Sequence, residues 1–434
     1  MFASLALSIT ALPFSVKVCH AGIIVLLIGW LFEGHWDEKL NIIKSSILLQ
    51  LTLGLFLIQL VGLLYSDSIT TGWFTLEKKI FFLLVPVALA TTKIKLSEQE
   101  IKLIFYSFLA SCFIGSLLCI LHAWDQTHII MAGKVPINRY FSTSAYHDLH
   151  PFDSEKWLIF SYVSLSEGIN IHPTYFSLYL GFCIIFLLHQ LHRVRSGIIK
   201  TGIWVLTLYF ALFVIFLASR IVILGLSIIF ILVLIRSLID KQRSIALVVI
   251  VIAFLFSFLL FINPVSRYRS LQEINFRTFE IQPDNIYKNA AQIRVSLWWL
   301  ALKSLRQENV AWGTGSGDVE KTMKQTSSRY NITNILNSFD PHNQYLYTLL
   351  GNGIIGFLLL ILFLGLPVHF AWLQKDYLLL GFSFLFSLLC FTETALELQK
   401  GIVFYTLFFS LLAFQYNSFQ SITINLRPML RADN

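Results

Sequence analysis

Residues 201–235 read TGIWVLTLYFALFVIFLASRIVILGLSIIFILVLI, an apolar run that contains one charged side chain, Arg220. As a single helix this run would measure about 50 Å, well beyond the ~30 Å hydrocarbon core of a bilayer. It must therefore fold back on itself as two membrane spans. Basic clusters at 193–200 and 236–243 flank the run. Because Lys and Arg stay on the cytoplasmic side during insertion, these clusters hold the outer ends there and leave Ser219 and Arg220 at a tight extracytoplasmic turn.

The composition of the whole chain agrees with a bilayer environment. Of its 434 residues, 56% are hydrophobic and 13% charged, whereas soluble domains carry about a quarter charged residues. Apolar stretches that predict spans lie at roughly 3–16, 18–33, 45–64, 80–92, 101–121, 171–190, 201–218, 221–235, 244–262, 343–366, 377–391 and 401–416. The first and fourth are shorter than the ~20 residues of a straight span. We predict an all-α, polytopic integral membrane protein of about twelve transmembrane helices, with residues 1–434 as one membrane domain.

Lysine and arginine in the short connections set the predicted orientation. They fall on alternate connections, at 39–44, 93–95, 193–200, 236–243 and 375, and again at 427–431. These connections and both termini are therefore predicted to be cytoplasmic. Two long loops, residues 122–170 and 263–342, then lie on the opposite side and are expected to hold the chemistry. This topology also accounts for the net charge of +8, because no basic run or nucleic-acid-binding motif accompanies it.

The second long loop contains a predicted helix. Apolar side chains recur near helical spacing in NAAQIRVSLWWLALKSLRQ, at Ile293, Leu297, Leu300 and Leu305. This pattern predicts an amphipathic helix resting on the membrane. The run WGTGSGD follows it. Because this run lacks the Lys-Ser/Thr ending of a phosphate-binding P-loop, its glycines are predicted to make a turn and not to bind a nucleotide.

Arg220 and Arg294 are candidate anion ligands on the predicted extracytoplasmic side. Arg220 opposes the usual charge bias of short loops, and its alternative role is that of an interfacial arginine whose head reaches water. Arg294 lies on the predicted loop helix, where an exposed structural cation is the alternative. A guanidinium group suits diphosphate because its planar fork donates two hydrogen bonds and keeps its charge at any working pH. Two such groups can hold one pyrophosphate.

His342, in SFDPHNQYLYTLLGNGIIG, lies where the second long loop re-enters the membrane. One interpretation is helix capping. The other is general-base chemistry, because histidine can take a proton from a sugar hydroxyl near neutral pH. Glu393 and Glu397, in FTETALELQKG, lie in the short extracytoplasmic turn before the last span. They are either interfacial charges or groups that position an arginine or the acceptor.

The first long loop contains the sequence HDLH, whose His147 and His150 could pair with Asp148 or Asp153 around a metal. No third ligand at diagnostic spacing accompanies them, so a solvated loop is expected and no metal site. The five cysteines lie in or beside apolar segments, which implies no disulfide framework. No cofactor is expected.

Motifs along the chain form a recognisable set. They are LLYSDSITTGWFTLEKKIFFLLVPVAL near 63–89, HPTYFSLYLGF from 172, SRIVILG from 219, IRVSLWW followed by WGTGSGD, and DPHNQYLYTLLGNGIIG from 340. Each motif is short, but their order, spacing and placement around one large loop are specific. Together they span roughly 63–400, and the set resembles the O-antigen ligase and O-antigen polymerase superfamily of bacterial envelope enzymes.

This resemblance implies a C-type glycosyltransferase fold in the bacterial inner membrane, with the active site facing the periplasm. It implies an undecaprenyl-diphosphate-linked glycan as donor and no metal. It also implies that Arg220 and Arg294 bind the donor diphosphate, that His342 activates the acceptor, and that Glu393 is the acidic residue near the last periplasmic turn. Asn343, beside His342, is placed with Arg220, Arg294 and Glu393 among the substrate-binding residues.

The predicted function is that of an O-antigen ligase-like glycosyltransferase, in which a hydroxyl of lipid A-core attacks the glycan as undecaprenyl diphosphate departs. The expected partners are this donor, lipid A-core or another glycan acceptor, and membrane lipids, but not nucleic acid. An O-antigen or exopolysaccharide polymerase and a protein O-oligosaccharyltransferase remain alternatives. A polysaccharide transporter or flippase is a different class that twelve spans also fit. Transporters, however, usually place binding groups near the midplane, whereas the polar groups here cluster at one face.

Overall fold

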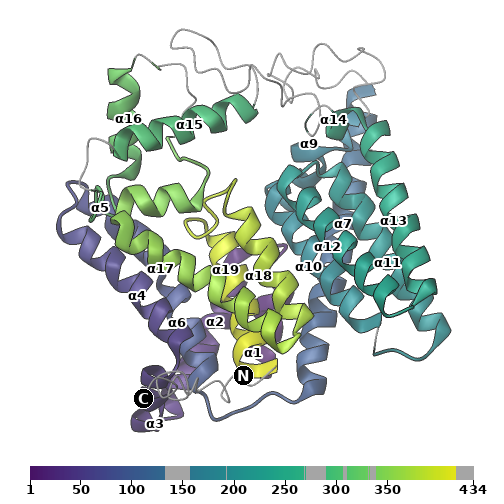
Figure 1. Ribbon diagram of the computed structural model, residues 1–434, viewed down its shortest axis with the longest axis horizontal. Coiled ribbons are helices and arrows are strands. Elements are labelled where there is room, and N and C mark those ends of the chain that lie inside the picture. The colour runs from purple at the N-terminus through teal and green to yellow at the C-terminus, as the bar shows by residue number, and fades with distance from the viewer. Residues whose placement is uncertain are drawn as a thin grey trace, which may run out of the picture.

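The computed structural model describes residues 1–131, 157–191, 193–267, 269, 290–305, 310–330, 332 and 339–416. Over these residues the regular elements are helices and no strand is present, which confirms the predicted all-α class (Figure 1). Seven of the helices are long and apolar enough to cross a bilayer. They are α4 (Ile47–Leu64), α7 (Glu98–Met131), α10 (Pro173–Leu191), α11 (Gly197–Phe216), α12 (Arg220–Ile239), α13 (Arg243–Ile262) and α17 (Gln344–Gln374). The chain is a multi-pass membrane protein.

The predicted count of about twelve spans is not confirmed. Each predicted apolar stretch does coincide with a helix, but several of these helices are short, namely α1 (Phe2–Ala11), α6 (Ile80–Thr91), α18 (Tyr377–Leu389) and α19 (Gln399–Ser410). Helices of this size measure only about 15–20 Å, against a ~30 Å hydrocarbon core. One bent pair, α2 (Val16–Phe32) and α3 (Trp36–Ser45), meets at 113° and raises the number of candidate spans to eight within the described residues.

The apolar run 201–235 folds back on itself as predicted. Helix α11 ends at Phe216 and α12 begins at Arg220. Between them Ala218 has a φ of 51°, a left-handed conformation that reverses the chain direction. Ser219 follows in extended conformation as the N-cap residue of α12. The tight turn therefore places Arg220 at the end of its helix, on the same side of the molecule as the loop helices α15 (Ala290–Leu305) and α16 (Val319–Arg329) (Figure 1).

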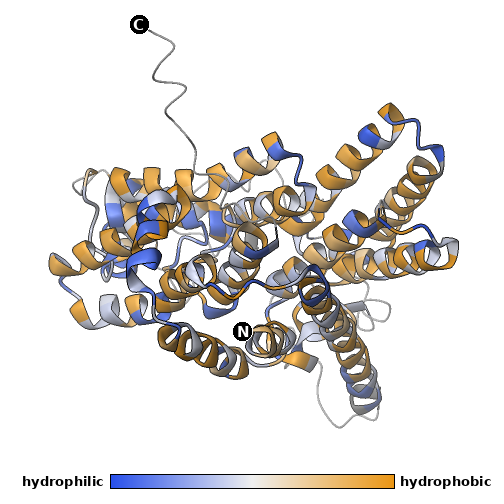
Figure 2. Cartoon of the chain, turned by 90° about the horizontal axis from the view of Figure 1, so that it is seen from below, coloured by the Kyte–Doolittle hydropathy of each residue, from blue (hydrophilic) through white to orange (hydrophobic). Residues whose placement is uncertain are grey.

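Helix α10 lies at the centre of the molecule. Of its membrane-length segment 94% is buried, against 22% for Ile245–Ile262 of α13. Its ring of Tyr179 stacks on Phe404 of α19 at 4.8 Å, and Phe182 meets Phe408 at 4.7 Å. Hydrophobic residues predominate along the surrounding helices, as the view from below shows (Figure 2). The aromatic content of the sequence thus serves an internal core as well as the lipid-facing surface.

The predicted amphipathic helix in the second long loop is α15. Part of its apolar face packs on protein: Leu297 and Leu300 are buried in a small cluster with Met323 of α16 and Leu350 of α17. This cluster is separate from the main core. It fixes α15, and with it Arg294, above the beginning of α17.

The run WGTGSGD makes a turn that packs against a break in α17. Gly353 has a φ of 63° and a ψ of −166°, so the helix is interrupted there. Thr314 N donates to Leu350 O at 2.8 Å, and Gly315 N donates to Gly351 O at 3.0 Å. A Cβ at Gly353 would lie 2.2 Å from Ala311 O, a distance that no side chain permits. The glycines therefore serve close backbone packing, in line with the predicted turn.

Candidate active site

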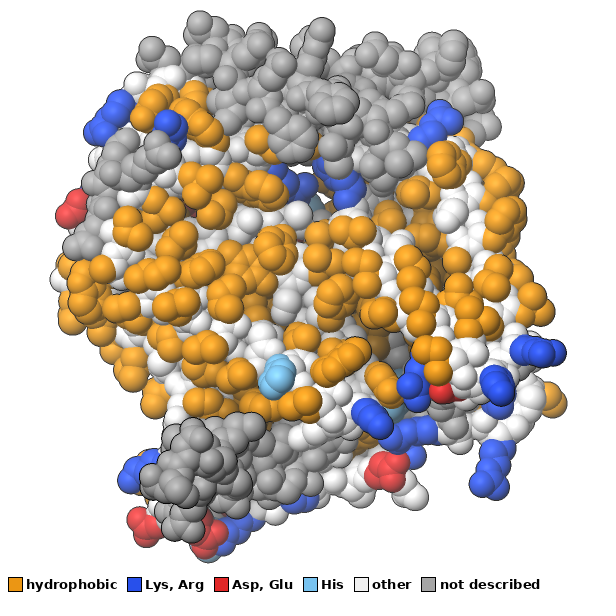
Figure 3. All heavy atoms as spheres, viewed as in Figure 1, with side chains coloured by type: hydrophobic (Ala, Val, Ile, Leu, Met, Phe, Trp, Pro, Cys, Tyr) orange, Lys and Arg blue, Asp and Glu red, His pale blue; other side chains and the backbone are white. Residues whose placement is uncertain are grey.

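A cavity of about 260 Å³ opens at the face that carries the loop helices. The residues that line it come from four regions of the chain: Thr174 of α10; Ser219, Arg220, Ile221 and Leu224 of α12; Arg269, Ala291, Arg294, Val295 and Trp298 of the second long loop; and Thr392 and Glu393 between α18 and α19. Basic side chains gather around a hollow in the upper part of the molecule (Figure 3). The cavity brings together Arg220, Arg294 and Glu393, three of the residues selected from sequence.

The described residues that line this cavity carry more positive than negative charge. Among its described lining residues, three are arginines and Glu393 is the one acid. The first turn of α12 adds to this character, because the N-terminus of a helix carries a partial positive charge. A cavity that is formally cationic and partly apolar suits an amphiphilic anion.

Arg269 was not predicted from sequence, yet it is the most buried of the three arginines, with 6% of its surface exposed. Its Nε donates to Ala218 O at 3.3 Å. Its guanidinium carbon lies 3.6 Å from the ring centroid of Tyr162, in cation–π contact. Arg269 therefore fixes the left-handed turn that precedes Arg220. No sequence signal singles it out, because Arg269 lies in the second long loop among several other basic residues and the charge rule applies to short connections.

Glu393 joins the arginine cavity to His342. It is 4% exposed. Its Oε1 accepts a hydrogen bond from an Nη of Arg294 at 2.8 Å, and its Oε2 lies 3.7 Å from Nδ1 of His342. The buried carboxylate of Glu393 thus contacts Arg294, which sequence analysis assigned to the donor, and His342, which it assigned to the acceptor.

The same contacts shift the pKa values of Glu393 and His342 in opposite directions. Burial opposes ionisation of Glu393, but His342 and Arg294 outweigh it and hold the pKa of Glu393 below its usual value. The facing Glu393 carboxylate raises the pKa of His342, against the opposing effects of burial and of Arg294. A carboxylate beside Nδ1 favours the tautomer in which that nitrogen carries the proton, and this leaves Nε2 as the basic atom.

The backbone around His342 shows that this residue is not the N-cap of α17. Asn343, not His342, is the N-cap of α17, since its side-chain oxygen accepts from Leu346 N at 3.0 Å. His342 has a φ of 45°, and its backbone N–H donates to Asp340 Oδ1 at 2.8 Å. The other oxygen of Asp340 accepts from Thr394 Oγ1 at 2.6 Å. His342 is therefore held in a strained local conformation by the connection that also carries Glu393.

Other candidate positions contribute less. His147, Asp148, His150 and Asp153 lie outside the described residues. Over the described part of the chain, no three His, Cys, Asp or Glu side chains come together as metal ligands would. A larger cavity of about 500 Å³ between α17 and α18 has an almost entirely apolar lining, which includes Tyr345, Gly365 and Trp372. Its lining includes His369 but no arginine, lysine or carboxylate, so it offers no group for a diphosphate, and we place the site at the smaller arginine cavity.

Comparison with known proteins agrees with the resemblance seen in the motifs. Residues 205–361 match the family described as O-antigen ligase. This segment runs from α11 into α17 and contains Arg220, Arg269, Arg294 and His342, whereas Glu393 lies beyond it. No curated protein matches the chain. Residues 205–361, roughly a third of the chain, therefore form a segment of the O-antigen ligase type within a multi-pass membrane protein.

Proposed function

We propose that this protein transfers a glycan from undecaprenyl diphosphate to a hydroxyl group of lipid A-core, at the periplasmic face of the inner membrane. The family match indicates chemistry of the O-antigen ligase or polymerase type. The observation that carries the finer proposal is the contact of Glu393 with both Arg294 and His342 beside a three-arginine cavity. That arrangement provides a diphosphate ligand and a base within one site.

The donor diphosphate would occupy the arginine cavity. Arg220 and Arg294 would donate charge-assisted hydrogen bonds to its oxygens, and Arg269 would hold the turn before Arg220. These groups favour the transition state because negative charge grows on the diphosphate as the glycosidic C–O bond breaks. The proposed reaction needs no metal, since guanidinium groups supply the positive charge. Ile221, Leu224 and Trp298 give the cavity an apolar side that suits the first units of the lipid carrier.

The acceptor hydroxyl would be activated by His342. As the acceptor oxygen forms its bond to the anomeric carbon, the electron pair of the breaking C–O bond leaves with undecaprenyl diphosphate. The hydroxyl proton passes to Nε2 of His342. Glu393, which faces Nδ1 of that ring at 3.7 Å, stabilises the imidazolium that results, as a buried carboxylate does in other His-carboxylate pairs. Asn343 remains a proposed substrate contact, although its side-chain oxygen also caps α17.

A deletion strain separates the acceptor classes. Loss of a ligase leaves carrier-linked polymer intact but unattached to lipid A-core, which is the expected result. Single repeat units attached to lipid A-core would instead identify a polymerase. Unchanged lipopolysaccharide with missing protein glycans would identify an oligosaccharyltransferase. Complementation with wild type and with His342→Gln in parallel links the phenotype to the site.

Cysteine labelling tests the side of the membrane. The five native cysteines are buried, so their background labelling is expected to be low. Gln325 of α16 and Asp37 of α3 are both exposed and lie at opposite ends of the helices. An impermeant reagent applied to intact cells with a permeabilised outer membrane should label Gln325→Cys and not Asp37→Cys. The reverse pattern would place the arginine cavity in the cytoplasm and overturn the proposed donor geometry.

A further inference from the structure

The connection between α18 and α19 carries Glu393, and it is tied down from a second direction. Below Glu393 in this connection lies Glu397, which is 8% exposed. Its Oε1 accepts a hydrogen bond from Nζ of Lys79 at 2.5 Å. Lys79 is 4% exposed and stands at the junction of α5 (Ile69–Lys78) and α6. The two members of this buried ion pair are thus 318 residues apart in the sequence.

Gln344 connects this ion pair to the two chain segments that carry His342 and Glu393. Its Nε2 donates to Glu397 Oε1 at 3.0 Å, and its Oε1 accepts from Leu396 N at 2.8 Å. Its backbone N–H donates to Cys390 O at 2.8 Å. Gln344 follows His342 by two residues, and the groups that it contacts flank Glu393 on either side. The relative position of His342 and Glu393 therefore depends on a buried amide whose side-chain partner is held by Lys79.

We propose, on the basis of the function proposed above, that Lys79 and Glu397 are positioning residues that set the contact between His342 and Glu393. A buried ion pair is a poor source of stability, because desolvation costs about as much as the attraction returns. Replacement by apolar residues of similar volume is often neutral or stabilising. We therefore attribute the burial of the Lys79–Glu397 pair to the position that it imposes on Gln344.

The test removes both charges and leaves the fold. Lys79→Met combined with Glu397→Leu replaces the pair by apolar side chains, and Gln344 Nε2 keeps Thr348 Oγ1 as an acceptor, 3.3 Å away. We expect a folded protein with a donor KM close to wild type and a kcat lower by about 10- to 100-fold, the size of effect that misplacement of a catalytic group by about 1 Å produces. The acid limb of the pH–rate profile should move to lower pH, because a displaced Glu393 no longer faces His342 and raises its pKa less, while Asp340 stays in place.

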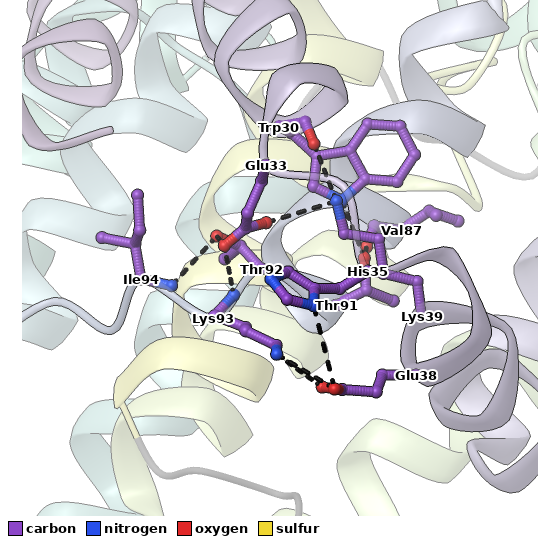
Figure 4. Close-up of polar contacts among 10 residues, drawn as sticks. All are labelled: Trp30, Glu33, His35, Glu38, Lys39, Val87, Thr91, Thr92, Lys93 and Ile94. Atoms are coloured by element: carbon purple, nitrogen blue, oxygen red, sulfur yellow. Dashed lines mark hydrogen bonds and ion pairs between the residues drawn. The ribbon is translucent and has the colours of Figure 1, made fainter.

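A matched control exists at the opposite end of the helices. Lys39, which is buried, and Glu33, which is partly exposed, also form an ion pair, with Nζ and Oε2 at 3.3 Å (Figure 4). Lys39→Met combined with Glu33→Leu should leave kcat and the acid limb unchanged. If both double variants lower kcat equally, or if the Lys79/Glu397 variant keeps wild-type kcat and acid limb, the positioning role is wrong.

Two further measurements test the proposal if the double variant does not fold or if the wild-type protein transfers no glycan. If the double variant does not fold, Glu397→Asp, which is one methylene shorter, should fold and still lower kcat, whereas Lys79→Arg should retain activity. If the wild-type protein transfers no glycan, the proposed function fails. The pKa of His342, followed by NMR of its labelled imidazole, then still tests the inference. It should fall in the double variant, and an unchanged pKa would overturn the positioning role.

Discussion

Two clusters of ionisable side chains occupy opposite ends of the helices, and they differ in how their charges are balanced. In the first, Glu33 accepts from Lys93 N at 2.6 Å and Thr92 Oγ1 at 3.1 Å, and pairs with Lys39 (Figure 4). Lys39 also donates to Trp30 O at 2.7 Å. In the second, Arg294 and His342 both contact Glu393, and Arg220 and Arg269 line the same cavity.

The difference separates a structural cluster from the proposed binding site. The Glu33 cluster ties the end of α2 to α3 and to the segment after α6, through the ion pair with Lys39 and the hydrogen bond from Lys93 N. Among the described residues that line the cavity of about 260 Å³ beside Glu393, positive charges outnumber negative ones. A group of arginines beside a cavity supports the anion site proposed above.

The largest expected difference between the clusters comes from His342→Gln. Glutamine keeps a hydrogen-bonding group but cannot accept a proton at neutral pH, so transfer should fall by about 10²- to 10⁴-fold. Single-turnover rates with saturating donor and acceptor measure this effect. In the other cluster, Lys39→Gln should lower the melting temperature and leave the rate unchanged. A His342→Gln protein that transfers at the wild-type rate would remove the base from the mechanism.

A smaller loss is expected when the guanidinium fork is replaced by an ammonium group. Arg220→Lys and Arg294→Lys each preserve charge but lose the bidentate geometry. A charge-assisted hydrogen bond contributes about 1.5–3 kcal/mol, which corresponds to roughly 10- to 100-fold in transfer at limiting donor. Expression and melting temperature should stay close to wild type. Full activity of both variants would favour the interfacial-arginine interpretation.

Arg269 provides a sharper contrast, because Arg267 lies two residues away, is exposed, and does not line the cavity. Arg269→Lys loses the planar contact with Tyr162 and the hydrogen bond from Nε to Ala218 O. Because this charged hydrogen bond to Ala218 O is lost, we expect the inhibition constant of inorganic pyrophosphate to rise about 10-fold. Arg267→Lys should bind pyrophosphate as wild type does. Equal binding by both variants would show that Arg269 has no part in shaping the anion site.

The sequence allowed prediction of those features that depend on local length and charge. The fold-back at Arg220 followed from the length of the apolar run 201–235, and the α15 helix followed from the spacing of its leucines. The number of spans did not follow, because hydropathy marks α1 and α18 as apolar without fixing whether helices of 10 and 13 residues cross the membrane. Packing against neighbours decides that.

The candidate site was only partly predictable. Arg220, Arg294 and His342 stood out by type and place, but their convergence on Glu393 depends on contacts about one hundred residues apart in the case of Arg294. Lys79 shares the feature that drew attention to Arg220, a cation on the face where short loops usually lack one, whereas Arg269 lies in the basic second long loop. Their burial, and the pairing of Lys79 with Glu397, could not be read from sequence because both come from tertiary packing.

The smallest expected effect concerns pH and tests Glu393 directly. The facing carboxylate raises the pKa of His342, and a base must be neutral to accept a proton. Transfer should therefore increase as pH rises through this raised pKa. Glu393→Gln removes the negative charge, so the pKa of His342 falls and the acid limb of the pH–rate profile moves to lower pH. The matched change in the other cluster, Glu33→Gln, should leave the acid limb in place.

An acid limb that stays fixed in Glu393→Gln would mean that the contact at 3.7 Å does not govern the proton affinity of His342. A shift of the acid limb to higher pH would mean that removal of the partner of Arg294 raises the pKa of His342 by some other route. The paired assignment of Glu393 and His342 would then be wrong.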